Sequence, residues 1–529
     1  MFTFLNKVLE KKIKLIVFFS FVLYFITGLF IFKDYGIAFD EDIQRSIGLS
    51  NYNFIKNFFQ GIKSEINFPS YGIGFEIPLI LFEKLFQIKN IENIYLLRHL
   101  IIFITSFVGQ VFFFFLLKKI FNSEKIALLG LLIFILSPRI FAESFYNSKD
   151  IIFMYSFIIC TYFAIIFLEN SNFKNAIIFG TLIAWSSNIR LAALFILIIV
   201  YYFYIIKILR KDNQSNAYFL SLNFFITLFF LVIFWPSLWS NPINNLFISI
   251  TSFANYDLNI SNLFLGEYIF AKSPPWFYIP TWIFITVPFY ILFFFSIGFF
   301  KILKRIYKRL ININDDKPLN DLWRGKKELR NLIFFSIIFI SILIPVVLQS
   351  TLYNGWRHFY FLYPFIIIIS LTEIKFYFTK YKNLRTLFIF ILLFCILFHF
   401  KLIINSHPHQ YSYFNFLAGK NPHKNFEVDY WGLSNKYALE KILKEENNSK
   451  KITVSNFSDT SLIQNLSFLN IKNKNFFIYI DKSENPDFLI DNNYFFNLGR
   501  KKINILNNYN VFDKLIVDGT LVTTIYKKK

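Results

Sequence analysis

Three consecutive carboxylates, Asp40, Glu41 and Asp42, follow the first long apolar stretch of the chain. Nothing in membrane packing requires them, but a carboxylate at the lipid–water boundary can act as a general base on an acceptor hydroxyl. The same residues also suit the start of a helix over residues 41–50, because carboxylates favour the positive end of a helix dipole. Both interpretations remain open from these residues alone.

A second charged segment, residues 137–150 (SPRIFAESFYNSKD), lies between two apolar stretches. Ionisable groups near membrane depth are costly and are functional candidates by default. Arg139, Lys149 and Asp150 are therefore candidates for a polar site. The structural alternative is an Arg139–Glu143 or a Lys149–Asp150 ion pair.

Further cations stand at the ends of apolar stretches on the same expected side. Arg190 lies in the segment NIRLA, and Arg357 and His358 lie in the segment YNGWRHF. All three side chains can donate hydrogen bonds to phosphate oxygens. A lone arginine at a helix end more often anchors the helix at the interface, but several converging cations favour an anion site.

The composition is typical of an integral membrane protein. The 529 residues are 55% hydrophobic and only 17% charged, with a mean hydropathy of +0.48, whereas soluble domains carry about 25% charged residues. The formal net charge is +22, but the basic residues stand in short runs beside apolar stretches, as in cytoplasmic loops. This pattern argues against nucleic acid as a partner. Cys160 and Cys395 both lie in apolar runs, so we expect no disulfide framework and no cysteine metal site.

About eleven apolar stretches are long enough to be considered membrane spans. They are residues 13–32, 95–117, 124–141, 150–168, 173–188, 190–208, 217–236, 276–300, 331–349, 357–374 and 384–404. The distribution of lysine and arginine predicts a cytoplasmic N-terminus on an uncleaved first helix, with the C-terminal part on the opposite side. Residues 71–87 are interrupted by Glu76, Pro78 and Glu83, which favours an interfacial helix over a span.

The composition changes after residue 405. We expect residues 1–405 to form a transmembrane catalytic domain, with residues 33–94 as the outer loop that carries the acidic motif. Residues 406–529 are rich in Asn, Lys, Asp and Ser, and predict a small extracytoplasmic α/β domain. Its expected elements are a helix over 434–446 and strands over 451–454, 476–480 and 520–526.

Common nucleotide and metal motifs are absent from the sequence. It has no P-loop, no GxGxxG followed by an acidic partner, and no HExxH. An enzyme on the outer face of a membrane has no access to ATP or nucleotide sugars. Any activated donor would therefore have to arrive through the membrane, most plausibly as a lipid phosphate.

Several of these segments, in this order, resemble one membrane-enzyme family. They are Asp40-Glu41 after the first span, the 137–150 segment ending in Asp150, SPPWFY at 273–278, GWRHF at 355–359, HPHQYSYFN at 407–415 and DYWG at 429–432. The pattern is similar to the GT-C glycosyltransferases of the dolichyl-phosphate-mannose–protein mannosyltransferase family (family 39). Their bacterial relatives include the aminoarabinose transferases that modify lipid A.

This resemblance implies an all-α polytopic GT-C fold and inverting transfer of a sugar from a polyprenyl-phosphate donor to an acceptor hydroxyl. Asp40 would be the general base, supported by Glu41, and Asp150 would orient the site or a divalent metal ion. The donor phosphate would be held by a set of cationic side chains: Arg139, Lys149, Arg190, Arg357 and His358. The acceptor could be a protein, a lipid or a glycan. Residues 406–529 do not resemble the β-trefoil repeats of the eukaryotic members, which weakens the case for a protein acceptor.

The implied location is a bacterial inner (plasma) membrane, with the C-terminal domain in the periplasm. Two other functions remain open from the sequence. A polymerase or ligase of lipid-linked glycans would share the outer-face charges. A transporter or flippase would place charges at the membrane midplane on broken helices, often in two similar halves, and neither feature is visible here. A scaffold would leave the carboxylates and cations without a purpose.

Overall fold

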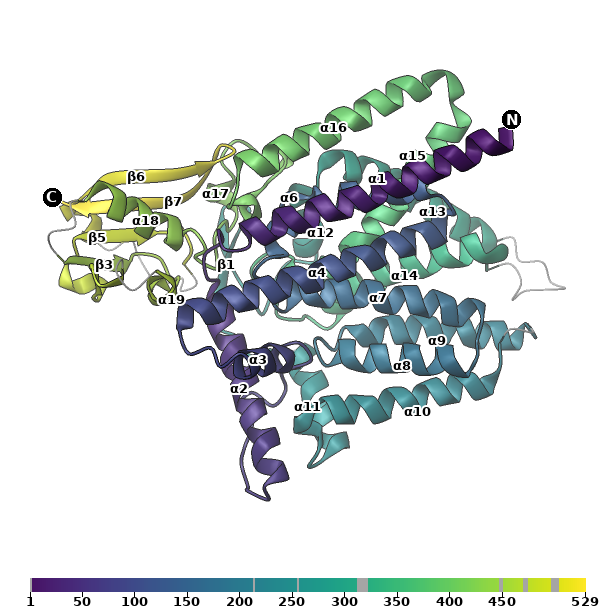
Figure 1. Cartoon of the computed structure of the whole chain (residues 1–529), viewed down its shortest axis with the longest axis horizontal. Coiled ribbons are helices and arrows are strands. Elements are labelled where there is room, and N and C mark those ends of the chain that lie inside the picture. The colour runs from purple at the N-terminus through teal and green to yellow at the C-terminus, as the bar shows by residue number, and fades with distance from the viewer. Residues whose placement is uncertain are drawn as a thin grey trace.

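The computed structural model describes residues 2–212, 215–254, 256–311, 322–446, 451–469, 474–495 and 504–529. The described chain forms a helical bundle followed by a smaller α/β unit at one end of it (Figure 1). The bundle helices are α1 (Phe2–Ile31), α4 (Ile91–Phe121), α5 (Glu124–Ile135), α7 (Asp150–Glu169), α8 (Phe173–Ser187), α9 (Ala193–Leu209), α10 (Ala217–Phe234), α13 (Phe289–Ile311), α14 (Gly325–Val347), α15 (Tyr363–Lys380) and α16 (Arg385–Asn405). Short helices connect them: α6 (Pro138–Glu143), η1 (Pro236–Leu238), α12 (Tyr278–Thr286), η3 (Arg357–Leu362) and η4 (Lys382–Leu384).

Seven stretches of the described residues form helices long and apolar enough to cross a membrane. They are Lys12–Ile31, Ile91–Phe121, Asp150–Glu169, Ala217–Phe234, Gly325–Val347, Arg357–Lys380 and Lys382–Asn405. This is fewer than the eleven expected, because four of the apolar stretches do not form one long apolar helix. Residues 124–141 divide into α5 and α6, and 276–300 divide into α12 and α13, while α8 and α9 have 15 and 17 residues. These shorter helices still pack within the bundle, α8 against α7 and α10.

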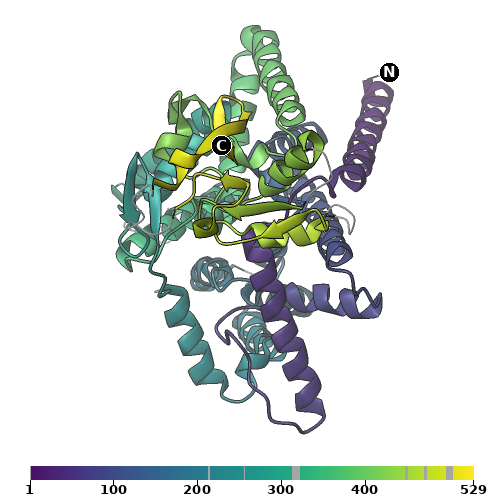
Figure 2. The same cartoon turned by 90° about the vertical axis from the view of Figure 1, so that its left-hand side faces the viewer.

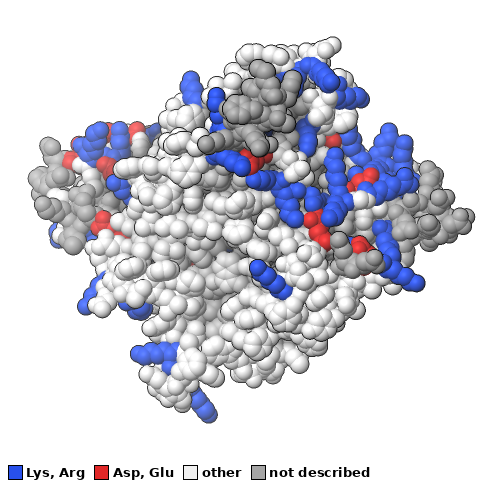
Figure 3. Space-filling model, turned by 45° about the vertical axis from the view of Figure 1, so that its right-hand side comes forward, with Lys and Arg blue, Asp and Glu red and all other residues white. Residues whose placement is uncertain are grey.

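The charged residues are distributed unevenly over the surface. Figure 3 shows lysine and arginine side chains gathered at the end of the bundle away from the α/β unit, next to a broad belt with almost no charged residues. A belt of this kind matches the hydrocarbon region of a bilayer, and the basic end matches the loops expected in contact with anionic lipid headgroups. Together with the seven apolar helices, it identifies a membrane protein.

Two helices, α2 (Phe39–Phe59) and α3 (Glu76–Leu85), lie between α1 and α4 in the sequence and are not part of the bundle. α2 is longer than the expected helix over 41–50, and it runs across the direction of the bundle helices (Figure 1). α3 has 10 residues, which at about 1.5 Å per residue is far too short to span a bilayer. The prediction that residues 71–87 contain a short helix rather than a span is therefore confirmed. A further short helix, α11 (Pro242–Ala254), and the hairpin of β1 (Ser261–Phe264) and β2 (Glu267–Phe270) belong to a later loop at this end.

The C-terminal unit is an α/β structure with its own small core. Its five-stranded sheet has the order β4-β3-β5-β7-β6, in which β3 is parallel to β4 and β5 while β7 is antiparallel to β5 and β6. The strands are β3 (Ile452–Asn456), β4 (Phe477–Tyr479), β5 (Phe488–Asp491), β6 (Tyr509–Val517) and β7 (Thr520–Lys528). The helices are α17 (Pro422–Asn425), α18 (Asn435–Glu445) and α19 (Leu462–Phe468), with single 3-10 turns η5 (Gln410–Ser412), η6 (Phe416–Ala418), η7 (Lys482–Glu484) and η8 (Asn504–Asn508).

The apolar face of α18 explains why this unit folds as it does. Ala438, Leu439 and Ile442 lie on one side of the helix and are fully buried against the sheet, in one cluster with Val454 and Ile490. The expected helix over 434–446 and the three expected strands are confirmed. Figure 2 looks onto the end of the bundle that carries this unit, and the unit lies above the start of α2.

Candidate active site

A small cleft opens where the start of α2 meets the 143–150 segment, η3 and the segment that follows α16. The space between its walls, counted together with the open solvent at its mouth, is about 250 Å³. Its lining consists of Ala38, Asp40, Glu41, Gln44, Tyr146, Asn147, Ser148, Lys149, Asp150, Arg357 and Trp431. Residues from four distant parts of the sequence therefore meet at one end of the bundle.

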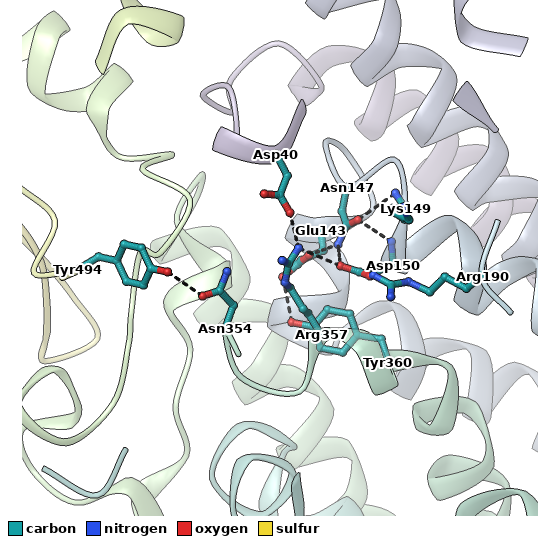
Figure 4. Close-up of polar contacts among 10 residues, drawn as sticks. All are labelled: Asp40, Glu143, Asn147, Lys149, Asp150, Arg190, Asn354, Arg357, Tyr360 and Tyr494. Atoms are coloured by element: carbon teal, nitrogen blue, oxygen red, sulfur yellow. Dashed lines mark hydrogen bonds and ion pairs between the residues drawn. The ribbon is translucent and has the colours of Figure 1, made fainter. Parts of the chain in front are cut away.

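Arg357 is the centre of the charge arrangement in this cleft (Figure 4). Its Nη1 lies 2.5 Å from Asp40 Oδ2 and 3.4 Å from Asp150 Oδ2. Arg190 approaches Asp150 from the other side through its own Nη2. The Asp150 and Arg357 side chains are only 1% and 5% exposed, whereas that of Asp40 is 29% exposed. Asp40 is thus the carboxylate of the pair that a ligand in solution can reach.

The Arg357 guanidinium packs against two aromatic rings, those of Trp431 and Tyr353. The guanidinium carbon lies 4.9 Å from the Trp431 ring centre and 5.2 Å from the Tyr353 ring centre. Such stacking favours a desolvated arginine and fixes the plane of its donors. The site therefore presents a rigid cation with a defined direction.

Lys149 supplies a further cation to the cleft. Among the described residues it forms no ion pair with a carboxylate, and its Nζ lies 4.1 Å from the centre of the Tyr71 ring. Burial, together with the nearby Arg190 guanidinium, lowers the pKa of Lys149 to about 7. The charges of Asp40 and Asp150 are balanced by Arg190 and Arg357, so Lys149 is the cation in excess when it is protonated.

Asn147 shapes the segment that delivers Lys149 and Asp150. Its side-chain oxygen accepts hydrogen bonds from the backbone N–H of Lys149 at 3.1 Å and of Asp150 at 2.8 Å. This caps the start of α7, where free N–H groups need acceptors. Its amide nitrogen donates to Glu143 Oε2 at 2.6 Å, and Tyr360 donates to Glu143 Oε1 at 2.9 Å. Burial raises the pKa of Glu143 to about 7.

A buried ion pair between α3 and α4 also holds the 143–150 segment in place. Ser148 Oγ donates to Glu76 Oε1 at 2.6 Å, and Arg98 Nη2 lies 2.7 Å from Glu76 Oε2. Both members of the pair are almost fully buried. Breaking a buried pair by removing one partner typically costs about 3–5 kcal/mol, so α3, α4 and the 143–150 segment are tied firmly together.

Glu41 lines the cleft, but its carboxylate is already occupied. Oε1 accepts a hydrogen bond from the Ala38 backbone N–H at 2.8 Å, and Oε2 lies 3.1 Å from Nε2 of the buried His99. This is the arrangement of a helix-capping residue. The structure therefore brings Asp40 and Glu41 to the same place but gives them different partners.

Three of the five expected phosphate ligands, Arg139, Arg190 and His358, are absent from the cleft lining. Arg139 donates from Nε to the Tyr413 carbonyl at 2.8 Å, and its guanidinium lies 4.7 Å from the centre of the Phe414 ring. The His358 ring packs edge-on against Tyr353, with 4.8 Å between the ring centres. Lys149 and Arg357 line the cleft, and Arg190 reaches it through its contact with Asp150.

The side chains of the cleft do not suit a resident divalent metal ion. No group of three or more His, Cys, Asp or Glu side chains arranged to hold a metal occurs in the described ranges. Asp150, the residue expected to orient the site or a metal, instead contacts two guanidinium groups. A bound cation would have to displace these arginines, so no step below uses a metal.

Four residues of the site region were not singled out from the sequence. Asn147 and Trp431 stand inside segments that drew attention, but an asparagine cap and a stacking tryptophan have no distinctive spacing. Tyr71 and Glu76 lie in the apolar segment interpreted as an interfacial helix, and only the folded chain shows that they face the 143–150 segment.

Comparisons with known proteins find similarity among solved structures. No family model and no curated protein matches the chain. Among solved structures it is similar to ArnT from Cupriavidus metallidurans bound to undecaprenyl phosphate. The identity is 10%, the TM-score is 0.44, and the alignment covers 95% of this chain and 97% of that one.

Proposed function

We propose that this protein is a GT-C-type membrane glycosyltransferase. It transfers a sugar from a polyprenyl-phosphate donor to an acceptor hydroxyl, with inversion, on the periplasmic face of a bacterial inner membrane. The N-terminus would be cytoplasmic and the C-terminal unit periplasmic. The observation that carries this proposal is the cleft in which Arg357 joins the accessible Asp40 to the buried Asp150, beside Lys149 and Arg190.

In the proposed reaction, the acceptor oxygen attacks the anomeric carbon of the donor sugar while the bond from that carbon to the phosphate oxygen breaks. Asp40 takes the proton of the acceptor hydroxyl, and polyprenyl phosphate leaves with the bonding electron pair. General-base help of this kind contributes roughly 10²–10⁴-fold. Asp40 suits the task because its side chain remains partly exposed.

The cations act on the leaving group. Charge builds up on the phosphate oxygen as the bond to the sugar breaks, and donors placed there in advance lower the barrier. Lys149 and Arg357 line the cleft and can face the phosphate, while Arg190 fixes Asp150. The site thus needs no nucleotide, in keeping with its place on the outer end of the bundle.

Arg357 also couples donor binding to the base. In the structure its guanidinium pairs with Asp40 and so occupies a carboxylate oxygen that the acceptor hydroxyl would need. A donor phosphate competes for the same guanidinium, because phosphate is a strong bidentate partner of arginine. Donor binding would therefore release Asp40 for the acceptor at the moment when it is needed.

The charges stand at the end of the bundle rather than halfway along the helices, which favours an enzyme over a transporter. A polymerase or ligase of lipid-linked glycans would use the same charges on a donor that carries a glycan chain rather than a single sugar. The test must therefore include donors of both kinds.

The direct experiment offers purified protein a panel of polyprenyl-phosphate sugars, with mixed membrane acceptors, and follows release of free polyprenyl phosphate. We expect one donor to be consumed, and Asp40→Asn to lower kcat by at least about 10²-fold. Asp42→Asn is the matched control, because Asp42 lies two residues further along α2, is exposed, and accepts a hydrogen bond from Tyr95. An active Asp40→Asn enzyme would contradict the assignment of the base, and no turnover of any donor by folded protein would contradict the function.

A further inference from the structure

The segment that leads into Asp40 is held by the C-terminal unit rather than by the bundle alone. Asn465, on α19, receives a hydrogen bond at Oδ1 from the Ile37 N–H at 3.0 Å and donates from Nδ2 to the Ile37 carbonyl at 3.0 Å. Its side chain thus pairs with both polar groups of one backbone residue, as a neighbouring strand would. Asn465 is 1% exposed, so loss of these bonds would leave buried polar groups unpaired.

The Trp431 segment makes the next contact along the chain. The Phe39 N–H donates to the Trp431 carbonyl at 3.0 Å. Because Phe39 is the residue directly before Asp40, this bond fixes the backbone at the point where α2 begins. The Trp431 side chain meanwhile stacks on Arg357, so one residue contacts Arg357 and the residue that precedes Asp40.

Close packing at Gly36 shows how tightly the two segments fit. A Cβ at position 36 would lie 2.3 Å from the Leu433 carbonyl oxygen and 2.9 Å from Asn465 Oδ1. The first is a backbone atom, which cannot move aside cheaply. Glycine is therefore required here by the approach of the C-terminal unit.

Polar contacts also hold residues 33 and 34, the start of the same segment. The contacts between residues 33–39 and the chain after α16 are called the clasp below. Lys436 Nζ donates to the carbonyls of Lys33 and Asp34 at 2.7 and 3.1 Å. His407 Nε2 lies 2.9 Å from Asp34 Oδ2. From residue 33 to residue 39, the chain is therefore bonded to residues that follow the last apolar helix.

The segment that makes these contacts is itself braced from within the C-terminal unit. Asp429 accepts hydrogen bonds from the backbone N–H of Leu433 and of Ser434, each at 3.0 Å. Asn492, at the end of β5, donates to the Asp429 carboxylate at 3.2 Å and to Ser434 Oγ at 2.9 Å. The sheet thus holds the 429–434 segment in a fixed shape.

We propose that the C-terminal unit is a positioning element of the active site: through Asn465 and the 431–433 backbone it clamps residues 36–39 and so sets where Asp40 stands against Arg357. This inference rests on the proposed function for its catalytic part. It assigns a purpose to residues 406–529 that requires no acceptor or partner to bind there. Asn465 acts through the backbone and is a positioning residue, because it does not line the cleft.

The test uses the full-length protein in membranes or detergent. Asn465→Leu removes both bonds to Ile37 while keeping the volume similar, and Gly36→Ala pushes the same segment away while leaving the Asn465 and Asp40 side chains chemically unchanged. Both should lower kcat by at least about tenfold with donor KM nearly unchanged, since misplacing a reacting group by about 1 Å can cost 10²-fold. Ser467→Ala is the matched control: it lies on the same helix, bonds only to the Gln464 carbonyl, and should behave as wild type.

A second readout does not depend on activity. Lys33 is exposed, so trypsin can cleave after it once the clasp opens. We expect faster cleavage at Lys33 in Asn465→Leu and in Gly36→Ala, but not in Ser467→Ala. Wild-type kcat together with wild-type cleavage in both variants would overturn the proposal. If no donor turns over in any protein, the proposed function fails, and the cleavage rates alone decide whether the clasp exists.

Discussion

Arg357 and Asp40, which are 317 residues apart in the sequence, form an ion pair of 2.5 Å in the cleft. The same guanidinium nitrogen lies 3.4 Å from Asp150. One side chain therefore connects the start of α2, the start of α7 and η3. The geometry of the site depends on one guanidinium nitrogen that lies between two carboxylates, on a side chain packed against the Trp431 and Tyr353 rings.

The first prediction concerns this bridge. Arg357→Lys keeps the positive charge but loses the planar group that packs against the Trp431 and Tyr353 rings and holds the nitrogen between the two carboxylates. We expect kcat/KM for the polyprenyl-phosphate donor to fall by at least about tenfold, measured as release of polyprenyl phosphate. Arg45→Lys is the control, because Arg45 pairs with Glu83 in the same loop but does not line the cleft. Equal activity of the two variants would rule out the bridging role.

The second prediction concerns pH and Lys149. With a pKa of about 7, Lys149 is charged below that pH and neutral above it. A phosphodiester donor keeps its single charge over this range, so the attraction should be lost as pH rises, and the donor Kd should increase by up to about tenfold per unit above pH 7. Binding of a non-hydrolysable donor analogue between about pH 6 and about pH 9 would measure this.

Lys149→Arg is the informative variant for that experiment, since an arginine remains protonated throughout the range. Its donor affinity should be nearly constant over the pH interval in which the wild-type affinity falls. Lys149→Met should bind weakly at every pH. A wild-type curve that Lys149→Arg reproduces would show that another group titrates.

The third prediction separates Glu41 from Asp40. Glu41 caps α2 and contacts His99, so Glu41→Gln, which preserves an acceptor for the Ala38 N–H, should retain most of the wild-type kcat. Glu41→Ala should lower the stability of the fold by about 1 kcal/mol or more, as the loss of a cap does. Thermal unfolding in detergent, compared with turnover, distinguishes the two effects. A Glu41→Gln enzyme as inactive as Asp40→Asn would instead give Glu41 a direct part in the reaction.

The fourth prediction concerns metal ions. Asp150 contacts Arg190 and Arg357, and the described residues offer no cluster of metal ligands. Turnover should therefore be unchanged after treatment with EDTA and after addition of Mg²⁺ or Mn²⁺. A loss of activity on chelation that is restored by one of these ions would require a site formed only with substrate bound.

The sequence predicted the broad architecture well, because long apolar stretches and basic runs have strong physical signatures. It predicted the number of spans less well, since Pro138 and Pro288 interrupt apolar stretches that look continuous by hydropathy alone. In the C-terminal unit, the spacing of apolar residues predicted α18, and three β-rich runs predicted β3, β4 and β7. The sheet order was not, because it depends on contacts between distant strands.

The candidate site was likewise predicted only in part. Asp40, Lys149, Asp150, Arg190 and Arg357 stood out as charges beside apolar segments, and the structure brings them together. Arg139 has the same signature but points to the Tyr413 carbonyl and the Phe414 ring instead. A charge near a helix end does not reveal which way its side chain turns.

The clasp between Asn465 and Ile37 has a consequence for biosynthesis. Ile37 leaves the ribosome early, whereas Trp431 and Asn465 are made after every apolar helix has been synthesised. Until they arrive, residues 36–39 lack the partners that fix the start of α2. A nascent or truncated chain can insert its helices into the membrane, yet it holds an incomplete cleft. On the proposed function, the cleft is therefore complete only after residues 431–465 have been made and have folded.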